Sequence, residues 1–197
     1  PELSDEDDWK KVHKLRTEVD AIMVGKGTIL KDNPKLHIKF YNHQGYHRIV
    51  MDSKLEIPIS SKVIKYQPSL YPTIICCLES VNEKREELFN KENVTLIKAG
   101  KGEKVDIRKA LKKLYKRGIN SILLEGGGTL NWSFLKKNLI DEMRLTIAPW
   151  MVGGTNATSL VEGIGFERIK ESPSFELLNL DYRNNYVRLH YKRKENK

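Results

Sequence analysis

The spacing of apolar positions along the chain follows two patterns, and each pattern predicts one kind of element. Short, largely apolar runs are typical of strands that are covered on both faces of a sheet. Six segments have this form: residues 21–24, 48–52, 73–78, 94–97, 119–124 and 144–147. We predict a strand at each of them.

The stretches between these runs have helical signatures. Ser4 and the acids that follow it are typical of a helix start, and Asn82 is a plausible cap. We predict helices over residues 5–16, 82–91 and 106–117, the last of which ends before Gly118. Strands that alternate with helices predict a parallel sheet wrapped by helices.

The last part of the chain has a different pattern. Two apolar segments, residues 175–180 and 186–191, flank the turn-forming residues 181–185, which predicts an antiparallel hairpin. No repeat, linker or low-complexity segment divides the chain. The predicted fold class is therefore α/β, a mixed, mostly parallel sheet flanked by helices with the hairpin at its C-terminal edge, in a single domain over residues 1–197.

Composition and charge narrow the classes of partner. With 197 residues, 39% of them hydrophobic and 31% charged, the chain has the composition of a globular domain. Its net charge of +9 is compatible with nucleic acid or with a phosphorylated small molecule. The basic residues are spread along the chain and interleaved with acids, which favours the small molecule and predicts no nucleic-acid partner.

Several residue types argue against other kinds of site. The two cysteines, Cys76 and Cys77, lie in an apolar run and are expected to be buried core residues. The five histidines show no metal-binding spacing, so no metal is expected. No apolar run approaches the roughly 18 residues that cross a bilayer, and no leader opens the chain, which predicts a cytoplasmic protein with no membrane partner.

The strongest candidate site follows the strand predicted over residues 119–124. There Glu125 precedes Gly126, Gly127 and Gly128, and a helix-like segment begins. Glycines at such a turn let backbone N–H groups approach a phosphate. The spacing matches neither the dinucleotide fingerprint nor a P-loop. A carboxylate at the carboxyl end of a parallel strand lies where such sheets bind ligands, so we expect Glu125 to face a ligand.

Two other strand ends carry polar groups. Thr28 and Asp32 follow the first strand and face the same way if that stretch is helical. Ser53 and Lys54 follow the second strand and offer a hydroxyl and an ammonium to the adenosine-ribose phosphate of NADPH. Each of these segments alone could be an ordinary turn. The two glycine-containing segments, residues 25–28 and 126–128, are expected at one edge of the sheet, which favours a shared nucleotide site.

Three segments, taken in order, resemble a known family. They are residues 19–36, which contain Gly25-Lys26-Gly27-Thr28, residues 48–53 and residues 124–128. Residues 149–154 and 160–163 extend the match. In these motifs, and over nearly its whole length, the chain is similar to the pyrimidine reductases of riboflavin biosynthesis. That family includes archaeal and fungal stand-alone enzymes and the reductase half of bacterial deaminase-reductases.

The resemblance implies a homodimer with a dihydrofolate-reductase-like fold. Its reaction would be reduction of the side chain of 2,5-diamino-6-(5-phosphoribosylamino)pyrimidin-4(3H)-one to the ribitylamino form, with NADPH as the reductant and NADH as the alternative. The phosphorylated pyrimidine would contact Arg16, Leu36, Lys39 and Glu125. The cofactor would contact Thr28, Asp32, Ser53, Gly127, Gly128, Thr129, Leu130, Asn131, Trp132 and Ser133. Asp32 and Glu125 are the candidate catalytic residues, since either could assist proton movement near the reacting carbon.

The resemblance has one departure and leaves alternatives open. Family members begin with a strand that carries a Ser/Thr-Leu-Asp-Gly-Lys-like motif, and none precedes Pro1, so we expect that strand to be missing. The alternatives are reduction of 5-amino-6-(5-phosphoribosylamino)uracil, another reductase of this fold, and a basic nucleic-acid-binding module. We expect the apolar face of the C-terminal hairpin to form the dimer interface, with these candidates: Phe175, Leu177, Leu189 and Tyr191.

Overall fold

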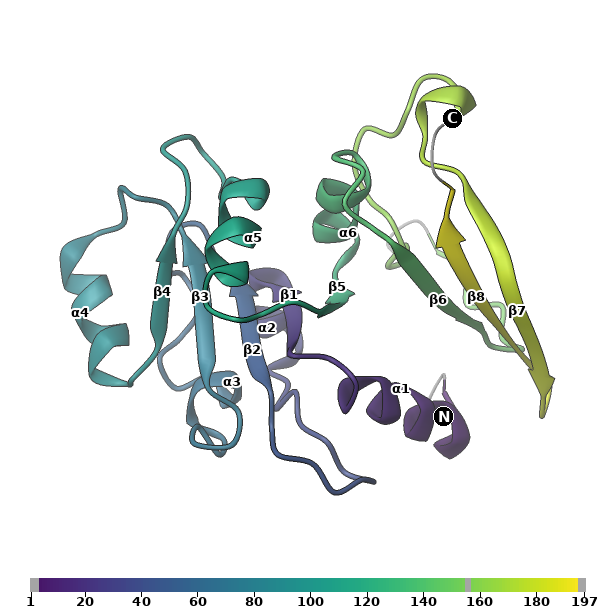
Figure 1. Cartoon of the computed structure of the whole chain (residues 1–197), viewed down its shortest axis with the longest axis horizontal. Helices are drawn as coiled ribbons and strands as arrows, with labels where there is room; N and C mark the ends of the chain where they lie inside the picture. The colour runs from purple at the N-terminus through teal and green to yellow at the C-terminus, as the bar shows by residue number, and fades with distance from the viewer. Residues whose placement is uncertain (1–3, 155–156, 195–197) are drawn as a thin grey trace. The chain divides into compact units, whose positions relative to one another are not determined.

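The computed structural model describes residues 4–154 and 157–194, and its contacts divide the chain into two compact units. The parallel-sheet unit comprises residues 11–127, and the antiparallel-sheet unit comprises residues 1–10 and 128–197. Helix α1 (Glu6–Arg16) contributes residues to both. Figure 1 shows the elements of each unit, coloured along the chain. That the chain is a single domain stays a prediction.

Five parallel strands form one sheet, in the order β4-β3-β2-β1-β5. They are β1 (Ala21–Gly25), β2 (His47–Met51), β3 (Thr73–Cys77), β4 (Thr95–Lys98) and β5 (Ile122–Gly126). Five of the predicted runs are confirmed as these strands, with small shifts at their ends. The inner strands β1, β2 and β3 are buried on both faces, which explains their continuous apolar sequences.

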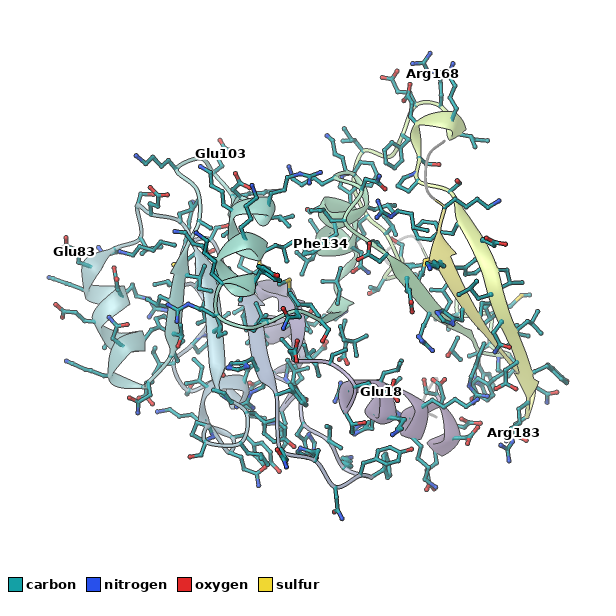
Figure 2. The ribbon with its side chains drawn as sticks, in the orientation of Figure 1. Glu18, Glu83, Glu103, Phe134, Arg168 and Arg183 are labelled. Carbon is teal, nitrogen blue, oxygen red and sulfur yellow. The ribbon has the colours of Figure 1, made fainter. Side chains whose placement is uncertain are left out.

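Four helices complete the parallel-sheet unit: α2 (Lys26–Asp32), α3 (Lys62–Lys65), α4 (Glu83–Lys91) and α5 (Ile107–Tyr115). The Asn82 side chain caps α4, as predicted, by accepting a hydrogen bond from a backbone N–H of its first turn. The sequence predicted α4 and α5, left α2 as a conditional helix, and did not predict α3, because four residues are too few to show a helical period. Charged side chains such as Glu83 and Glu103 point outward from this unit (Figure 2).

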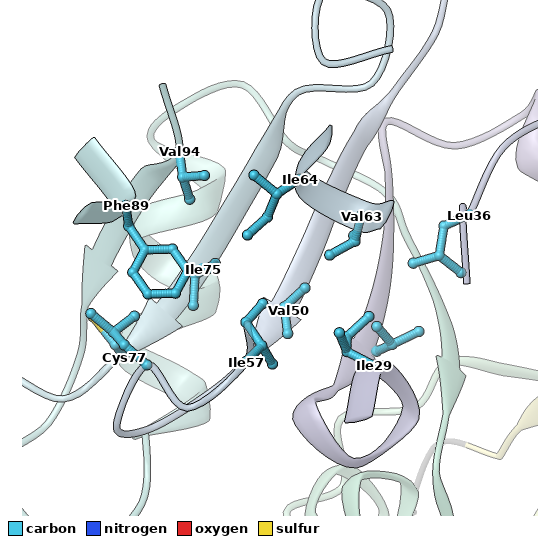
Figure 3. Packing of buried hydrophobic residues seen from close by; sticks show 12 residues of the cluster. Ile29, Leu36, Val50, Ile57, Val63, Ile64, Ile75, Cys77, Phe89 and Val94 are labelled. Atoms are coloured by element: carbon cyan, nitrogen blue, oxygen red, sulfur yellow. The ribbon is translucent and has the colours of Figure 1, made fainter. Parts of the chain in front are cut away.

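The core of this unit joins three of its helices to the sheet. Ile29, Val63 and Phe89, from α2, α3 and α4, lie in one buried cluster with Val50 and Ile75 of the strands (Figure 3). The two cysteines of β3 are also fully buried, and burial raises the pKa of their thiols to about 12 and about 11. The thiols are therefore protonated core groups, which confirms the sequence prediction.

The antiparallel-sheet unit contains a second, three-stranded sheet in the order β6-β8-β7. Its elements are α6 (Gly128–Leu135), β6 (Glu142–Ile147), a 3-10 turn η1 (Ile169–Glu171), β7 (Phe175–Arg183) and β8 (Tyr186–Arg193). The predicted hairpin is confirmed as β7 and β8. Residues 144–147, which we grouped with the parallel strands, instead pair antiparallel with β8, so the parallel and antiparallel strands form two sheets.

The turn of this hairpin is shorter than predicted. Only Asn184 and Asn185 separate the strands, and both have positive φ, of 51° and 65°. Two-residue turns of this kind match the twist of the flanking strands, and asparagine tolerates the left-handed region. The strands therefore continue through most of residues 181–185.

Cross-strand register gives the three-stranded sheet one apolar face. Leu189 of β8 is paired with Leu145 of β6 and Leu180 of β7, and the neighbouring pairs on that face are also apolar. The apolar face is formed by Met143, Leu145, Ile147, Leu177, Leu180, Tyr182, Val187, Leu189 and Tyr191. Several of these side chains are exposed: Ile147, Leu177, Leu180 and Tyr182. So large an exposed apolar area is typical of an association surface.

Candidate active site

The order of the parallel strands reverses at β1. From β1 the chain adds β2, β3 and β4 on one side, and β5 then pairs with the other side of β1. In open parallel sheets, ligands bind beyond the carboxyl ends of the strands at such a reversal. Gly25 ends β1 and Gly126 ends β5, so both glycine loops that the sequence singled out begin at this point.

The two glycine loops contact each other. Thr28, in the first turn of the helix α2 that directly follows β1, donates a hydrogen bond from its Oγ1 to the carbonyl oxygen of Gly126 at 3.4 Å. Gly126 and Gly127 have φ values of +69° and +90°. A Cβ on Gly127 would lie 3.5 Å from the Thr28 Oγ1, which is ordinary van der Waals contact. The left-handed backbone, rather than a lack of space, is therefore what requires glycine there.

Arg16 and Glu125, both predicted to face the substrate, form a bidentate ion pair. Arg16 donates from Nε to Glu125 Oε1 at 2.7 Å and from Nη2 to Oε2 at 2.6 Å. The two side chains are only 9% and 18% exposed. Burial alone would lower the pKa of Arg16, but the hydrogen bond and charge of Glu125 outweigh it and raise that pKa. Arg16 therefore keeps its charge although its side chain is largely buried.

The other predicted substrate residues, Leu36 and Lys39, lie in a segment that contacts Arg16. Arg16 Nη1 donates to the carbonyl oxygen of His37 at 2.7 Å. Leu36 is buried with a φ of +45°, whereas Lys39 is exposed. The backbone N–H of Lys39 donates to His13 Nδ1 at 2.9 Å. The structure thus brings all four predicted substrate residues into one connected group.

His13 makes the stability of this group dependent on pH. Burial, and then the charge of Arg16, lower the pKa of His13 from 6.5 to about 4. The unfolded chain therefore takes up this proton at a higher pH than the folded protein does. We expect the free energy of unfolding to fall as the pH drops from 6.5 towards 4. Urea titrations of the parent protein and of His13→Gln over this range measure the effect, and the variant should show a smaller slope. Equal slopes would contradict this assignment.

Ser53 lies at the carboxyl end of β2, the strand next to β1. Its Oγ accepts a hydrogen bond from the backbone N–H of Val105 at 3.2 Å, so the hydroxyl proton can still be donated to a ligand. The preceding residue, Asp52, is fully buried and accepts from the backbone N–H of Ile57 at 2.9 Å. Asp52 therefore shapes the loop that presents Ser53.

Asp32 differs from the other predicted residues. It is the last residue of α2 and, as predicted, lies one helical turn after Thr28. Its side chain is exposed, and within residues 4–154 and 157–194 no hydrogen bond or ion pair holds the carboxylate. The structure therefore brings Asp32 into the region of Thr28 but not into the network around Glu125.

The remaining predicted cofactor residues begin α6, in the antiparallel-sheet unit. Gly128 is buried, and a Cβ on it would lie 2.6 Å from the Cγ of Glu162. The Thr129 hydroxyl donates to Glu162 Oε2 at 2.8 Å, and Asn131 Nδ2 donates to the carbonyl oxygen of Leu160 at 2.8 Å. These side chains bind the segment over residues 160–163, which the sequence had also singled out.

Trp132 lies on the same helix and is packed between aromatic and glycine neighbours. Its ring meets Phe166 edge-on at 4.9 Å, and a Cβ on Gly163 would lie 2.3 Å from it. Ser133 donates its hydroxyl to the Thr129 carbonyl at 2.8 Å, and Leu130 is half-buried. Glycine at position 163 is thus what allows the indole to lie against the backbone.

Across residues 4–154 and 157–194, no group of three or more His, Cys, Asp or Glu side chains is arranged to hold a metal ion. In the same residues, no helix combines the length and the apolar character needed to cross a membrane.

Sequence reasoning missed four buried residues around the Leu36 segment. His13, Tyr46, Arg48 and Tyr71 are all buried and bond to its backbone. The one available signal was Arg48, because an arginine within a strand that is covered on both faces must have internal partners. Which carbonyls it binds could not be inferred from local patterns.

An α/β protein with glycine turns and paired charges at the reversal point of a parallel sheet has the architecture of a nucleotide-dependent enzyme. The model of the RibD C-terminal domain family matches residues 1–185, and the chain belongs to this family. This confirms the resemblance inferred from the ordered motifs.

Curated relatives agree with this membership, and a solved structure has the same fold. The chain is 37% identical over 186 residues to the 2,5-diamino-6-ribosylamino-4(3H)-pyrimidinone 5′-phosphate reductase of Aquifex aeolicus, covering 94% of this chain and 80% of the relative. It is 36% identical over 179 residues to the protein of the same name from Methanothermobacter thermautotrophicus, covering 89% and 81%. Acinetobacter baumannii RibD, form 2, superposes with a TM-score of 0.79 at 20% identity, covering 98% of this chain and 52% of that one. This likeness confirms the predicted dihydrofolate-reductase-like fold.

Proposed function

We propose that this protein reduces the ribosylamino side chain of 2,5-diamino-6-ribosylamino-4(3H)-pyrimidinone 5′-phosphate to the ribitylamino form, with NADPH as the reductant. The observation that carries the proposal is the buried, bidentate pair of Arg16 and Glu125 at the end of β5. Family membership and the names of the relatives support the choice of substrate.

The proposed reaction adds a hydride and a proton to the substrate. Opening of the ribose ring converts C1 and the attached nitrogen to an imine; hydride addition at C1 and protonation of the nitrogen then give the amine. NADPH, when bound, supplies the hydride, and the protein's own contribution is orientation and electrostatics. No group that donates the proton is assigned by the geometry.

The substrate residues suit different parts of the molecule. Both oxygens of Glu125 accept from Arg16, and each keeps a further lone pair that can accept from an amino group of the pyrimidine. Glu125 is therefore better suited to orient the substrate than to donate a proton. The exposed ammonium of Lys39 suits the 5′-phosphate, although it lacks the planar, bidentate geometry of an arginine.

The cofactor is expected at the reversal point of the sheet. Gly126 and Gly127, which have positive φ values, carry no side chain that would obstruct a ligand at this turn. Thr28 and Ser53 supply hydroxyls at neighbouring strand ends. These residues fit a dinucleotide, which needs close backbone approach and polar donors. Contacts from Asp32, and from the predicted stretch that begins at Gly127, are part of the same proposal.

The decisive experiment measures the loss of the reduced nicotinamide absorbance when NADPH is mixed with the protein and the diamino substrate. We expect turnover with this substrate, and none with dihydrofolate. Faster turnover with the amino-uracil substrate would assign the alternative step to the same site. Binding of NADPH without turnover of either pyrimidine would overturn the proposed substrate.

Preference for NADPH over NADH is expected to depend on Ser53 and its neighbour Lys54. Replacing both, as Ser53→Ala with Lys54→Met, should raise the KM for NADPH by about 100-fold or more, since two hydrogen bonds to a charged group at about 1.5–3 kcal/mol each would be lost. The KM for NADH should change little, because NADH lacks that phosphate. Lys62→Met, another exposed lysine of this unit, is the control. Equal changes with both cofactors would contradict this role.

We further propose that the protein is a homodimer joined through the apolar face of the three-stranded sheet. Of our sequence candidates, Leu177 is exposed on this face, and Leu189 and Tyr191 lie on it half-buried. Leu180→Lys is expected to give monomers in sedimentation at micromolar concentration. Asn179→Lys, on the opposite face of β7, should remain dimeric. A monomeric parent protein would contradict the interface.

Two expectations about the cell remain part of the proposal. A cytoplasmic location fits the protonated, unpaired thiols and a phosphorylated substrate. No nucleic-acid partner is expected, and titration of the protein with RNA and DNA at low salt tests that expectation.

A further inference from the structure

An unusual set of contacts holds the segment over residues 35–39, which belongs to no helix or strand. Backbone groups of five consecutive residues each bond to a side chain from elsewhere in the parallel-sheet unit. The bonds are Arg48 Nη1 to Lys35 O at 2.9 Å, Tyr46 Oη to Leu36 O at 2.7 Å, Arg16 Nη1 to His37 O at 2.7 Å, Ile38 N to Tyr71 Oη at 3.2 Å and Lys39 N to His13 Nδ1 at 2.9 Å. Side chains therefore supply, for this segment, the backbone bonds that a helix or a sheet would otherwise provide.

The backbone of this segment needs such support. Leu36 has a φ of +45°, in the left-handed region that residues with a Cβ adopt at a cost in free energy. A conformation of this kind persists only where its surroundings determine it. Strained backbone of this sort is concentrated at ligand sites, and Leu36 is one of the predicted substrate residues.

Arg48, one of these supporting side chains, donates hydrogen bonds to three backbone carbonyls. Its side chain is fully buried, and besides Lys35 it donates to the carbonyl oxygens of Tyr66 and Tyr71 and lies over the Tyr71 ring at 5.3 Å. Burial lowers the pKa of Arg48 to about 10, so it is charged at neutral pH. Within residues 4–154 and 157–194 it has no carboxylate partner. Its charge therefore binds three carbonyls from two separate segments, the Leu36 segment and the connection between α3 and β3.

Burying a charge that has no counter-ion costs free energy of desolvation, and an apolar side chain of similar volume would stabilise the core without that cost. The advantage of Arg48 is geometric, since a guanidinium fork binds several carbonyls at defined angles. The two tyrosine hydroxyls extend this control to Leu36 and Ile38. Together the three side chains act on the segment that carries the proposed substrate contacts.

We propose that Tyr46, Arg48 and Tyr71 are positioning residues for the substrate, acting through the backbone of residues 35–39. They hold Leu36 and Lys39 in the arrangement that binds the phosphorylated pyrimidine, and they do not touch the reacting atoms. The inference rests on the proposed function for its consequence in catalysis. The backbone contacts themselves do not depend on it.

The test uses one conservative variant of each of the three supporting side chains. Tyr46→Phe and Tyr71→Phe delete bonds to Leu36 and Ile38, and Arg48→Lys keeps the charge but loses the fork. Thr73→Val is the matched control, because the buried Thr73 hydroxyl donates to the Val63 carbonyl, at 2.5 Å, outside this segment. KM and kcat for the pyrimidine, the Kd for NADPH, and hydrogen exchange of the Ile38 and Lys39 amides are measured for each.

We expect the tyrosine variants to raise the KM for the pyrimidine by about tenfold or more, since small displacements of binding groups have effects of this size. Their kcat at saturation and Kd for NADPH should stay close to those of the parent, and Thr73→Val should leave all three close to the parent values. Equal changes of KM in the tyrosine variants and the control, or none in either, would overturn the positioning role.

Hydrogen exchange separates this proposal from the proposed function. If the parent protein does not reduce the pyrimidine, the proposed function fails. Faster exchange of the Ile38 and Lys39 amides in Tyr71→Phe, but not in Thr73→Val, would still support positioning of the segment. Unchanged exchange in Tyr71→Phe would overturn it, whatever the substrate.

Discussion

Glu125→Ala is expected to lower kcat/KM for the phosphorylated pyrimidine by about 100-fold and the free energy of unfolding by about 3 kcal/mol. The stability loss arises because Arg16 would keep its charge in a site where it is only 9% exposed, without its partner. The activity loss arises because the pyrimidine would lose the Glu125 carboxylate as a hydrogen-bond acceptor, which Arg16 orients through two hydrogen bonds. Initial rates and urea unfolding measure the two effects separately.

A double variant separates the structural from the functional part of this loss. Arg16→Met with Glu125→Leu removes both charges, and replacing a buried ion pair by apolar residues is often neutral for stability. We expect stability to return while turnover stays low. The control is Glu86→Gln, which breaks an ion pair with Lys98 at 2.7 Å. Because the side chains of Glu86 and Lys98 are 25% and 38% exposed, this variant should lower the free energy of unfolding by less than about 1 kcal/mol. Recovery of turnover in the double variant would contradict a substrate role for the pair.

Arg188→Ala is expected to lower the free energy of unfolding by about 3 kcal/mol, because it leaves the buried carboxylate of Asp8 without its cation. Arg188 is 8% exposed in the antiparallel-sheet unit. It forms ion pairs with Asp5, Asp7, Asp8 and Asp181 at 3.5, 3.3, 3.2 and 3.5 Å. The acidic first turn of α1 is therefore held by one arginine of β8.

Two further variants test whether burial causes this effect. Arg193, on the same strand, pairs with Asp141 at 3.0 Å, but the side chains are 30% and 86% exposed, so Arg193→Ala should cost under about 1 kcal/mol. Arg188→Met with Asp8→Leu removes the most buried carboxylate together with the arginine and should recover part of the loss. Similar losses for Arg188→Ala and Arg193→Ala in urea unfolding would refute the argument from burial.

Local patterns predicted the strands and helices well, because each depends on side chains that are close in sequence. The apolar runs of β1 and β3 follow from burial on both faces. Asn82 and Gly118 mark helix ends for reasons of hydrogen bonding and backbone freedom. Such signals need no knowledge of the rest of the fold.

The assignment of β6 to a sheet was wrong although the sequence held a signal. Residues 142–147 alternate between polar and apolar side chains, whereas β1 and β3 of the parallel sheet have continuous apolar runs. Alternation is typical of an antiparallel sheet with one face on water. Comparing the alternating pattern of β6 with the continuous apolar pattern would have placed β6 in a different sheet. The sequence does not show that β6 pairs with β8, because strand pairing depends on chain reversal between distant segments.

By itself, the sequence determined the element order, the glycine turns at the strand ends, and the family. The tertiary structure decided that Arg16 and Glu125, 109 residues apart, form a bidentate pair, and that Arg48 and two tyrosines hold the Leu36 segment. The physical reason is that periodicity and capping are local, whereas these contacts exist only after the strand order β4-β3-β2-β1-β5 has brought distant side chains to one buried region.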